Sequence, residues 1–502
     1  MNKTFEKLTP WLTKAYALNA ALILFEWDNE TEAPEAASAL TAHAIETLSS
    51  EYYKTIINND VKKLLKQLAT ETNLTDKERT ILKDLQKQYD SLEPIPPVKY
   101  QAYQGLIARA PAIWAKAKAS DDYRMFAPTL KEIIEYQKEF IDYRLKASKG
   151  KRLPYDLLLD DYEEGFTMQK LDVFFEMLKE EIIPLIQMVN EKKDKIDKSY
   201  NYRGYPLNLQ KEFNRKLAKH LGFDFKRGVI KESVHPFTTN LHNKDVRITT
   251  AYHENNLESA IFSTIHESGH ALYEMHIGDE LTATPAGGGA SMGMHEGQSR
   301  LFENNFGRSR DFWVPLFQDL KDIFPESLAD TDLDTFILGI NKSAPGLIRT
   351  ESDELTYSLH IIIRYEIEKM IFEKNADIDK LPDIWNKKYK EYLGVTPKNA
   401  SEGILQDIHW ACGNFGYFPS YALGNAIAAQ IYAHLKQVMP LDDYLKSGNF
   451  QPINEYLKDH IHRFGKTKTT NEILRDMMGE DFNPQYYIDY LKEKYETLYR
   501  YL

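Results

Sequence analysis

The residues with the clearest chemical potential are the two histidines and the glutamate of a His-Glu-x-x-His sequence at positions 266–270. On a helix, His266 and His270 lie one turn apart on the same face and can direct two imidazoles at one ion. Imidazole is a good zinc ligand, and a catalytic zinc keeps one position for water beside three protein ligands. Glu267 follows the first histidine and can take a proton from that water. The spacing predicts a metal site for hydrolysis; a buried helix with two satisfied histidines is the alternative.

A third ligand must come from another position. His276 stands six residues after His270, but a ligand there requires a glycine three residues after His270, where this chain has Tyr273. A helix that continues through Tyr273 turns by about 100° per residue and carries His276 away from the His270 face. Glu274 lies too far along the same helix. We therefore exclude both His276 and Glu274.

A glutamate from a following helix is the other solution, as in zinc sites with two histidines and one glutamate. Glu296 and Glu303 both lie in the next helical stretch, two turns apart, so both can share one face. Glu296 stands next to three flexible glycines at 287–289 and between His295 and Gln298. We prefer Glu296 as the ligand and keep Glu303 as the alternative.

Composition limits the class of protein. The chain has 502 residues, enough for a large core, and its net charge of −12 argues against nucleic acid as a partner. A single cysteine, Cys412, excludes an internal disulfide framework and fits a reducing compartment. The apolar stretch 15–25 ends without a small-residue cleavage site, and no run approaches the length of a membrane span. We expect a cytoplasmic protein with no membrane partner.

Helical periodicity dominates the chain. Helical stretches are predicted at 4–90 with breaks at 32–34 and 73–76, at 99–147, 167–198, 200–225 and 426–502, with a surface loop at 148–154. Thr75, followed three residues later by Glu78, predicts a helix N-cap. In residues 245–252, charged or polar residues alternate with β-branched residues, and this stretch is the best strand candidate. The strand stands just before the metal helix, by which we mean the predicted helix that carries His266 and His270. Such a strand can pair with an extended peptide or form a structural hairpin, and both interpretations stay open.

Two later regions carry residues suited to substrate binding. Arg349 stands beside two acids at the start of a long helix predicted over 347–372, where it can form a salt bridge or grip a carboxylate at two points. Residues 403–410 and 415–425 place histidine, tryptophan and tyrosine side chains around glycines. This composition suits the wall of a pocket.

Six motifs stand in one order along the chain. They are His235-Pro236-Phe237, Asp245-Val246-Arg247-Ile248-Thr249, His266–His270, His295-Glu296-Gly297-Gln298, Ile348–Asp353 and Gly403–Trp410. In these motifs, and over nearly its whole length, the chain resembles the M32 metallocarboxypeptidases, the thermostable carboxypeptidase Taq family. The resemblance implies a mainly α-helical protein with a small β-sheet beside a deep active-site groove.

The resemblance also implies a domain plan and a site. It implies a single domain over 1–502, in which about 1–200 form one wall of the groove and about 201–502 the catalytic part. His266, His270 and Glu296 would hold one zinc ion per chain, which Co²⁺ or Mn²⁺ can replace, and Glu267 would be the base. A homodimer is implied as well.

The activity implied is release of single amino acids from the free C-termini of peptides, with broad specificity. An exopeptidase must anchor the terminal carboxylate with a cation, and Arg349 is the first candidate and Arg247 the second. His409 and Tyr421, with Tyr417 behind, are candidates to stabilise the oxyanion.

Two other functions stay open. One is a zinc oligopeptidase that cuts internal bonds of short peptides, and the other is a helical scaffold or binding protein with a chance motif. The partners that orient the two ligand histidines are also open, with Asp353 and Asp407 as candidates.

Overall fold

The computed structural model describes residues 2–148, 152–500 and 502. Within them the chain is mainly α-helical with one small three-stranded sheet, as predicted. It forms two compact units, each built from three segments: residues 1–90, 198–340 and 431–482 in the first, and 91–197, 341–430 and 483–502 in the second. The single domain with a division near residue 200 stays a prediction. None of the described helices is both long and apolar enough to cross a membrane.

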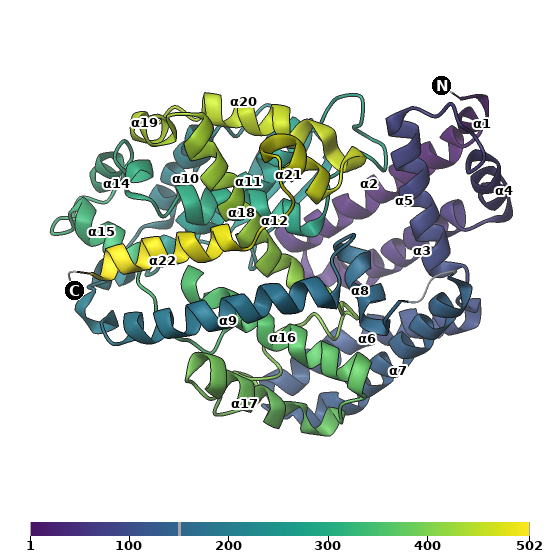
Figure 1. The fold of residues 1–502 in the computed structure, drawn as a ribbon, viewed down its shortest axis with the longest axis horizontal. Helices are drawn as coiled ribbons and strands as arrows, with labels where there is room; N and C mark the ends of the chain where they lie inside the picture. Colours follow the sequence, from purple (N-terminus) through teal and green to yellow (C-terminus); the bar gives the residue numbers. More distant parts are fainter. Residues whose placement is uncertain (1, 149–151, 501) are drawn as a thin grey trace. The chain divides into compact units, whose positions relative to one another are not determined.

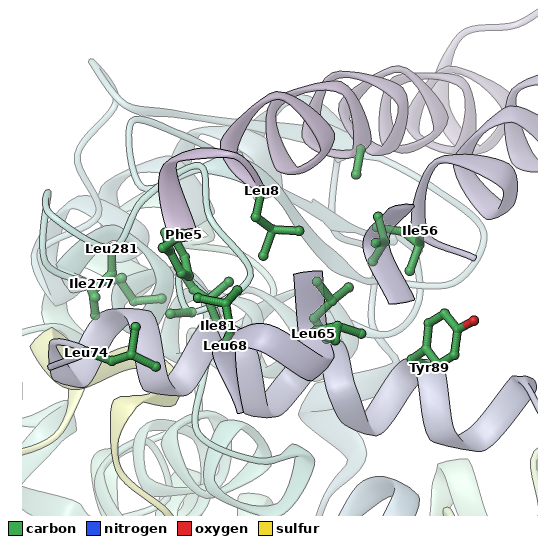
Figure 2. Close-up of a cluster of buried hydrophobic side chains, with 14 residues drawn as sticks. Phe5, Leu8, Ile56, Leu65, Leu68, Leu74, Ile81, Tyr89, Ile277 and Leu281 are labelled. Carbon is green, nitrogen blue, oxygen red and sulfur yellow. The ribbon is translucent and has the colours of Figure 1, made fainter. Parts of the chain in front are cut away.

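The N-terminal part of the first unit confirms the predicted helices and their breaks. Its elements are α1 (Lys3–Glu6), α2 (Thr9–Thr31), the 3₁₀ turn η1 (Glu35–Ala37), α3 (Ser38–Ile56), α4 (Asn59–Leu68) and α5 (Asp76–Leu92). The predicted cap forms, because the Glu78 amide donates to Thr75 Oγ1 at 3.2 Å and the Thr75 amide donates to Glu78 Oε2 at 2.9 Å. Buried side chains of these helices meet Ile277 and Leu281, which follow the metal helix (Figure 2). A hydrophobic cluster thus ties the N-terminal helices to that segment.

The middle of the chain completes the first unit around its sheet. The elements are η3 (Ser199–Tyr202), α10 (Leu207–Leu221), β1 (Gly228–Glu232), β2 (Thr238–His242), β3 (Asp245–Thr250), α11 (Leu257–His276), α12 (Met292–Arg300), the π-helix η4 (Leu301–Phe306), α13 (Arg310–Trp313), α14 (Phe317–Ile323) and α15 (Leu333–Ile340). Its C-terminal part adds α19 (Leu441–Ser447), α20 (Gln451–His460), η7 (His462–Thr467) and α21 (Thr470–Met478). Helix α18 (Pro419–Val438) has residues in both units.

The predicted strand is β3, the central strand of the sheet. The order is β1-β3-β2, with β1 parallel to β3 and β2 antiparallel to it. Val246 and Ile248 of β3 are buried against Ala271 and Met275 of α11, so the sheet supports the metal helix from one side. Strands β2 and β3 form the structural hairpin, whereas pairing with a substrate peptide stays a prediction.

The second unit contains helices joined by loops and no strand among its described residues. Its elements are α6 (Pro97–Ala119), α7 (Tyr123–Ala147), α8 (Pro154–Tyr162), α9 (Met168–Asn190), η2 (Lys193–Lys195), η5 (Arg349–Glu351), α16 (Glu354–Lys374), η6 (Ile378–Lys380), α17 (Leu381–Leu393) and α22 (Gln485–Tyr499). Helix α9 lies beside both α16 and α22 (Figure 1). The loop predicted at 148–154 includes residues 149–151, which lie outside the described residues.

The helical patterning predicted over 99–147 forms two helices, because Asp121 adopts a left-handed conformation (φ 55°) and Asp122 caps α7 by accepting a bond from the Arg124 amide. One prediction for the second unit was wrong. The helix predicted from 347 begins only at Glu354, because the Asp353 carboxylate accepts the amides of the first turn. Arg349 therefore lies in a separate 3₁₀ turn.

Candidate active site

Helices α11 and α12 carry the candidate metal ligands, and a glycine sets how closely they approach. A Cβ atom at Gly269 of α11 would lie 2.7 Å from the Gln298 carbonyl oxygen and 2.7 Å from the Ser299 Cα of α12. Only glycine therefore permits this contact. The Ser291 hydroxyl caps the start of α12 by accepting the Met294 amide. The glycine inside the His-Glu-x-x-His sequence thus allows α12 to bring Glu296 to the histidines.

Three ligand atoms converge from these two helices. Glu296 Oε2 lies 3.5 Å from His270 Nε2 and 3.8 Å from His266 Nε2, and the three groups offer atoms within 4.8 Å of one another. Two atoms bound to one tetrahedral zinc at about 2.0–2.1 Å are roughly 3.4 Å apart. The spacing, the two imidazoles and the carboxylate therefore fit a zinc ion. His276, which we excluded, does not belong to this group.

Each ligand histidine is held through its other ring nitrogen. His266 Nδ1 lies 2.8 Å from Glu303 Oε2. His270 Nδ1 lies 2.6 Å from His295 Nδ1, and His295 Nε2 lies 2.7 Å from Glu274 Oε1. Since a carboxylate only accepts hydrogen bonds, we assign the facing nitrogens of His266 and His295 as donors.

These assignments fix the tautomer of both ligands. His295 donates from Nε2 to Glu274, so we assign its Nδ1 as an acceptor, and His270 donates to it from its own Nδ1. Both His266 and His270 then have a free lone pair on Nε2, on the side of Glu296. Partners of this kind orient metal-binding histidines in general.

Arg300 joins the two carboxylates of α12 and the π-helix. Its Nε donates to Glu296 Oε1 at 2.7 Å and its Nη1 donates to Glu303 Oε2 at 2.8 Å. Burial raises the pKa of both acids, but Arg300 and the histidines outweigh burial, and each pKa is lowered overall. Both groups are therefore carboxylates at neutral pH. Glu296 uses one oxygen for Arg300 and keeps Oε2 toward the histidines.

The two histidines differ in their ease of protonation. Burial lowers the pKa of His266, but the Glu296 and Glu303 carboxylates outweigh burial and raise it overall. Burial lowers the pKa of His270 to about 3, and the neighbouring His295 and His266 rings lower it further, which together outweigh the raising effect of Glu296. Glu303 therefore makes His266 the more basic of the two imidazoles.

Glu267 is a buried acid beside this cluster. Burial, together with Glu296 and Glu303, raises its pKa and outweighs the lowering by His266 and by the Thr238 hydrogen bond. The Thr238 hydroxyl of β2 donates to its Oε2 and holds the side chain in place. A carboxylate with a raised pKa accepts a proton more readily at neutral pH, which suits a general base.

The expected partners of the ligand histidines were wrong. Asp353 caps α16 and accepts a bond from Ser343, and Asp407 pairs with two arginines. Glu303 and the His295–Glu274 pair act instead. Sequence spacing contained part of this signal, because Glu303 stands two helical turns after Glu296 and Glu274 one turn after His270.

Arg349 lies in the second unit within a buried cluster of charge. Its Nε is 3.0 Å from Asp407 Oδ1, and Arg364 Nε is 2.7 Å from Asp407 Oδ2. One carboxylate thus serves two guanidinium groups and leaves a surplus positive charge. The Tyr421 ring lies 5.1 Å from the Arg349 guanidinium.

His409 lines the same cluster with the predicted tyrosines. Its Nε2 lies 3.4 Å from the Tyr421 hydroxyl, and its ring centroid is 5.6 Å from that of Tyr417. Burial lowers the pKa of His409 to about 4, so the ring is neutral at neutral pH. The structure therefore brings together four of the predicted substrate residues, namely Arg349, His409, Tyr417 and Tyr421.

Arg247 of the first unit has a different environment. It donates to both oxygens of Asp245 at 2.8 Å, a one-to-one pair. The Trp27 ring lies 5.6 Å from its guanidinium and 5.8 Å from the Phe237 ring. Two of the six motif segments and Trp27 of α2 thus meet here, and Asp245 balances the charge of Arg247.

A convergent pair of histidines and a glutamate, with a buried acid following the first histidine, on a mainly helical scaffold, defines a metallopeptidase. A family model described as Carboxypeptidase Taq (M32) metallopeptidase matches residues 7–495. The chain belongs to this family of metallocarboxypeptidases.

Named relatives and solved structures agree with this assignment. The chain is 42% identical over 481 residues to Carboxypeptidase 1 of Bacillus subtilis, covering 95% of each chain. It is 33% identical to Thermostable carboxypeptidase 1 of Pyrococcus furiosus, covering 98% of this chain and 99% of the relative. Among solved structures it matches Trypanosoma cruzi metallocarboxypeptidase 1 with a TM-score of 0.93 at 32% identity, covering 98% and 99% of the two chains.

Proposed function

We propose that this protein is a zinc-dependent carboxypeptidase that releases single amino acids of many kinds from the C-termini of peptides. The observation that carries the proposal is the convergence of His266, His270 and Glu296 beside the buried Glu267. Peptides with a free C-terminus are the proposed substrates. A homodimer and a cytoplasmic location stay predictions.

Zinc is the proposed ion because the donor set contains two imidazoles and one carboxylate at tetrahedral spacing. Co²⁺ or Mn²⁺ can occupy the same ligands. When bound, the ion supplies a Lewis acid that polarises a water molecule and the carbonyl of the peptide bond to be cleaved. Glu303, His295 and Glu274 hold both imidazoles in the tautomer that leaves the lone pair of Nε2 free on the side of Glu296.

Glu267 is proposed to carry the proton. It takes a proton from the attacking water and later delivers it to the amine that leaves. Its raised pKa supports both steps, since a strongly acidic carboxyl would not hold the proton. Thr238 restrains the carboxylate through its hydroxyl.

Arg349 is proposed to anchor the terminal carboxylate of the substrate. The surplus positive charge of its cluster favours it over Arg247, whose charge Asp245 already balances. His409, Tyr421 and Tyr417 are proposed to stabilise the developing oxyanion as neutral hydrogen-bond donors.

Two experiments test this function. Purified protein is analysed for metal, and a free-ended peptide is digested and followed in time by mass spectrometry. We expect about one zinc ion per chain and a ladder of products, each one residue shorter than the last. Internal cleavage would point to an oligopeptidase, and protein without stoichiometric metal would point to a scaffold.

The carboxylate anchor is tested separately. We expect Arg349→Ala to lose most activity on a peptide with a free C-terminus and to change little on the same peptide with an amidated C-terminus. Arg247→Ala is the comparison variant. An equal loss on both peptides for Arg349→Ala would exclude it as the anchor.

A further inference from the structure

A hollow lies in the first unit, and its lining includes none of the candidate metal ligands. Its volume is about 930 Å³, which is within the range of small-molecule sites. It lies where α10 and α11 end, beside α20. We name it the α10/α11 pocket, and it is lined by Lys219, Asn243, His276, Asn454, Lys458 and Arg463 among others.

Two buried asparagines of this pocket each have an unused acceptor. Asn243 Nδ2 donates to the Ile277 carbonyl at 2.9 Å and Asn454 Nδ2 donates to the Leu221 carbonyl at 2.8 Å. These bonds cap α11 and α10 and fix the orientation of both amides. Asn243 Oδ1 and Asn454 Oδ1 are buried and accept no hydrogen bond from the described residues. An unmet buried acceptor costs about 1–3 kcal/mol, so a ligand that brings a donor is favoured.

The lining of the pocket also carries charged side chains of both signs that form no ion pair among the described residues. Lys219, Lys458 and Arg463 are exposed and form no ion pair among the described residues. The same holds for the carboxylates of Glu280 and Asp459. The pocket can therefore receive a cationic and an anionic group at once.

We propose that the α10/α11 pocket binds a zwitterion of the α-amino acid type, either a free amino acid or a short peptide. Its ammonium group would lie against the carboxylates of Glu280 and Asp459 and, after a small movement of the two buried amides, donate to the oxygens of Asn243 and Asn454. Its carboxylate would lie against Lys458 and Arg463. The proposal rests on the proposed function only for the source of the ligand, because both compounds are products of a carboxypeptidase.

A chain of hydrogen bonds links the pocket to the helix that carries Glu296. His276 lines the pocket, and its Nδ1 lies 3.1 Å from His462 Nδ1. His462 is buried, and its Nε2 lies 2.9 Å from Gln298 Oε1 on α12. Gln298 stands two residues after Glu296. The proposal therefore includes coupling, in which occupancy of the pocket alters the hold of α12 on the metal.

Binding is tested in full-length Glu267→Gln, which should not hydrolyse the probes. Calorimetry measures the affinity of the protein for L-alanine and dialanine. The same measurement is made for N-acetylalanine, which lacks the ammonium, and for alaninamide, which lacks the carboxylate. We expect the zwitterions to bind at least tenfold more tightly than both blocked compounds. The tighter binding of either alanine or dialanine shows whether the natural ligand is a free amino acid or a short peptide.

Charge reversal assigns this binding to the pocket. Lys458→Glu together with Arg463→Glu should weaken it at least tenfold, whereas Lys66→Glu together with Lys374→Glu, at exposed positions outside the lining, should not change it. Unchanged affinity in the first variant overturns the proposal. Pocket-dependent binding of N-acetylalanine as tight as that of alanine also overturns it, because the site would then be a simple anion site.

Coupling has its own readout. The rate of Zn²⁺ release to a chelator is measured in the unmodified protein with and without saturating alanine or dialanine. We expect at least a twofold change, abolished in Lys458→Glu/Arg463→Glu. No change in rate overturns the coupling. Peptidase activity of the same double variant, measured without added product, should equal that of the unmodified protein, so failure of the proposed function is seen independently.

Discussion

His266 Nδ1 lies 2.8 Å from Glu303 Oε2, whereas the matching nitrogen of His270 lies 2.6 Å from a second histidine, His295. The two candidate ligands are thus held by unlike partners. The Glu303 carboxylate contacts His266 directly, whereas the His295 ring stands between His270 and the Glu274 carboxylate. The two sides of the site should therefore respond differently to mutation.

Removing the charge of Glu303 should weaken metal binding. Glu303→Gln keeps the shape but loses the carboxylate that accepts from His266 and pairs with Arg300. Loss of such a partner typically costs 10–100-fold in metal affinity. Competition with a zinc chelator measures the effect. Glu326→Gln, on the exposed surface, should be unchanged, and unchanged zinc affinity in Glu303→Gln would show that His266 needs no acidic partner.

The relay on His270 should depend on the ring of His295. His295→Phe removes both nitrogens, so we expect a loss of about 10-fold or more in zinc affinity. Glu274→Gln retains an acceptor for His295 Nε2, so its loss should be smaller. The same chelator assay ranks the two variants. The reverse order would mean that the charge of Glu274, not the ring of His295, holds His270.

Gly269→Ala should separate the helices that carry the ligands. The added Cβ would meet backbone atoms of α12 at 2.7 Å, and backbone cannot yield as a flexible side chain does. We expect about 1–3 kcal/mol of destabilisation and weaker zinc binding, from the thermal midpoint and the chelator assay. Gly105→Ala on α6 is the control, since its nearest contact would be at 3.9 Å and it should stabilise slightly. A Gly269→Ala protein with normal zinc affinity would rule out this role.

Glu267→Gln should abolish turnover without loss of metal. The amide keeps the size of the side chain but cannot take a proton, and general-base catalysis contributes about 10²–10⁴-fold. We expect kcat to fall by about 10²-fold or more while the zinc content stays the same. Steady-state kinetics and metal analysis on one preparation provide both values. Full turnover would remove Glu267 from the mechanism.

Stability of the second unit should fall between pH 5 and pH 8 through one buried acid. Burial raises the pKa of Glu368 from 4.5 to about 7, although Tyr155, Trp410 and Gly416 donate to its carboxylate. The folded state then binds more protons than the unfolded state between these values. The contribution of Glu368 to the free energy of unfolding is fully present below about pH 4.5 and is lost as pH rises through about 7. The change is on the order of 3 kcal/mol.

The thermal midpoint at pH 5 and pH 8 tests this dependence. Glu368→Gln should lower stability at both values, because its amide nitrogen faces a donor, but it should reduce the difference between them. Glu391→Gln, exposed on α17, should keep the full difference. An equal difference in Glu368→Gln and the unmodified protein would assign the pH dependence to other groups.

The sequence alone determined the local geometry of the metal candidates. Residues four apart on a helix share a face whatever the rest of the chain does, so the convergence of His266 and His270 follows from spacing. The same reasoning rejected His276, since Tyr273 lets the helix continue. The sequence also predicted the N-cap formed by Thr75 and Glu78 and the strand β3, because caps and strands depend on neighbours in sequence.

Only the tertiary structure decided which side chains from distant segments meet. Periodicity placed Glu296 and Glu303 on one face, but the close approach at Gly269 and the π-helix gave them different roles. Asp353 and Asp407 were equally good candidates from sequence, and they serve a helix cap and an arginine pair. A break at Asp121 and a late start of α16 were missed, because a left-handed residue and a capping carboxylate leave little trace in periodicity. Contacts between segments far apart in sequence depend on packing, and no local pattern records them.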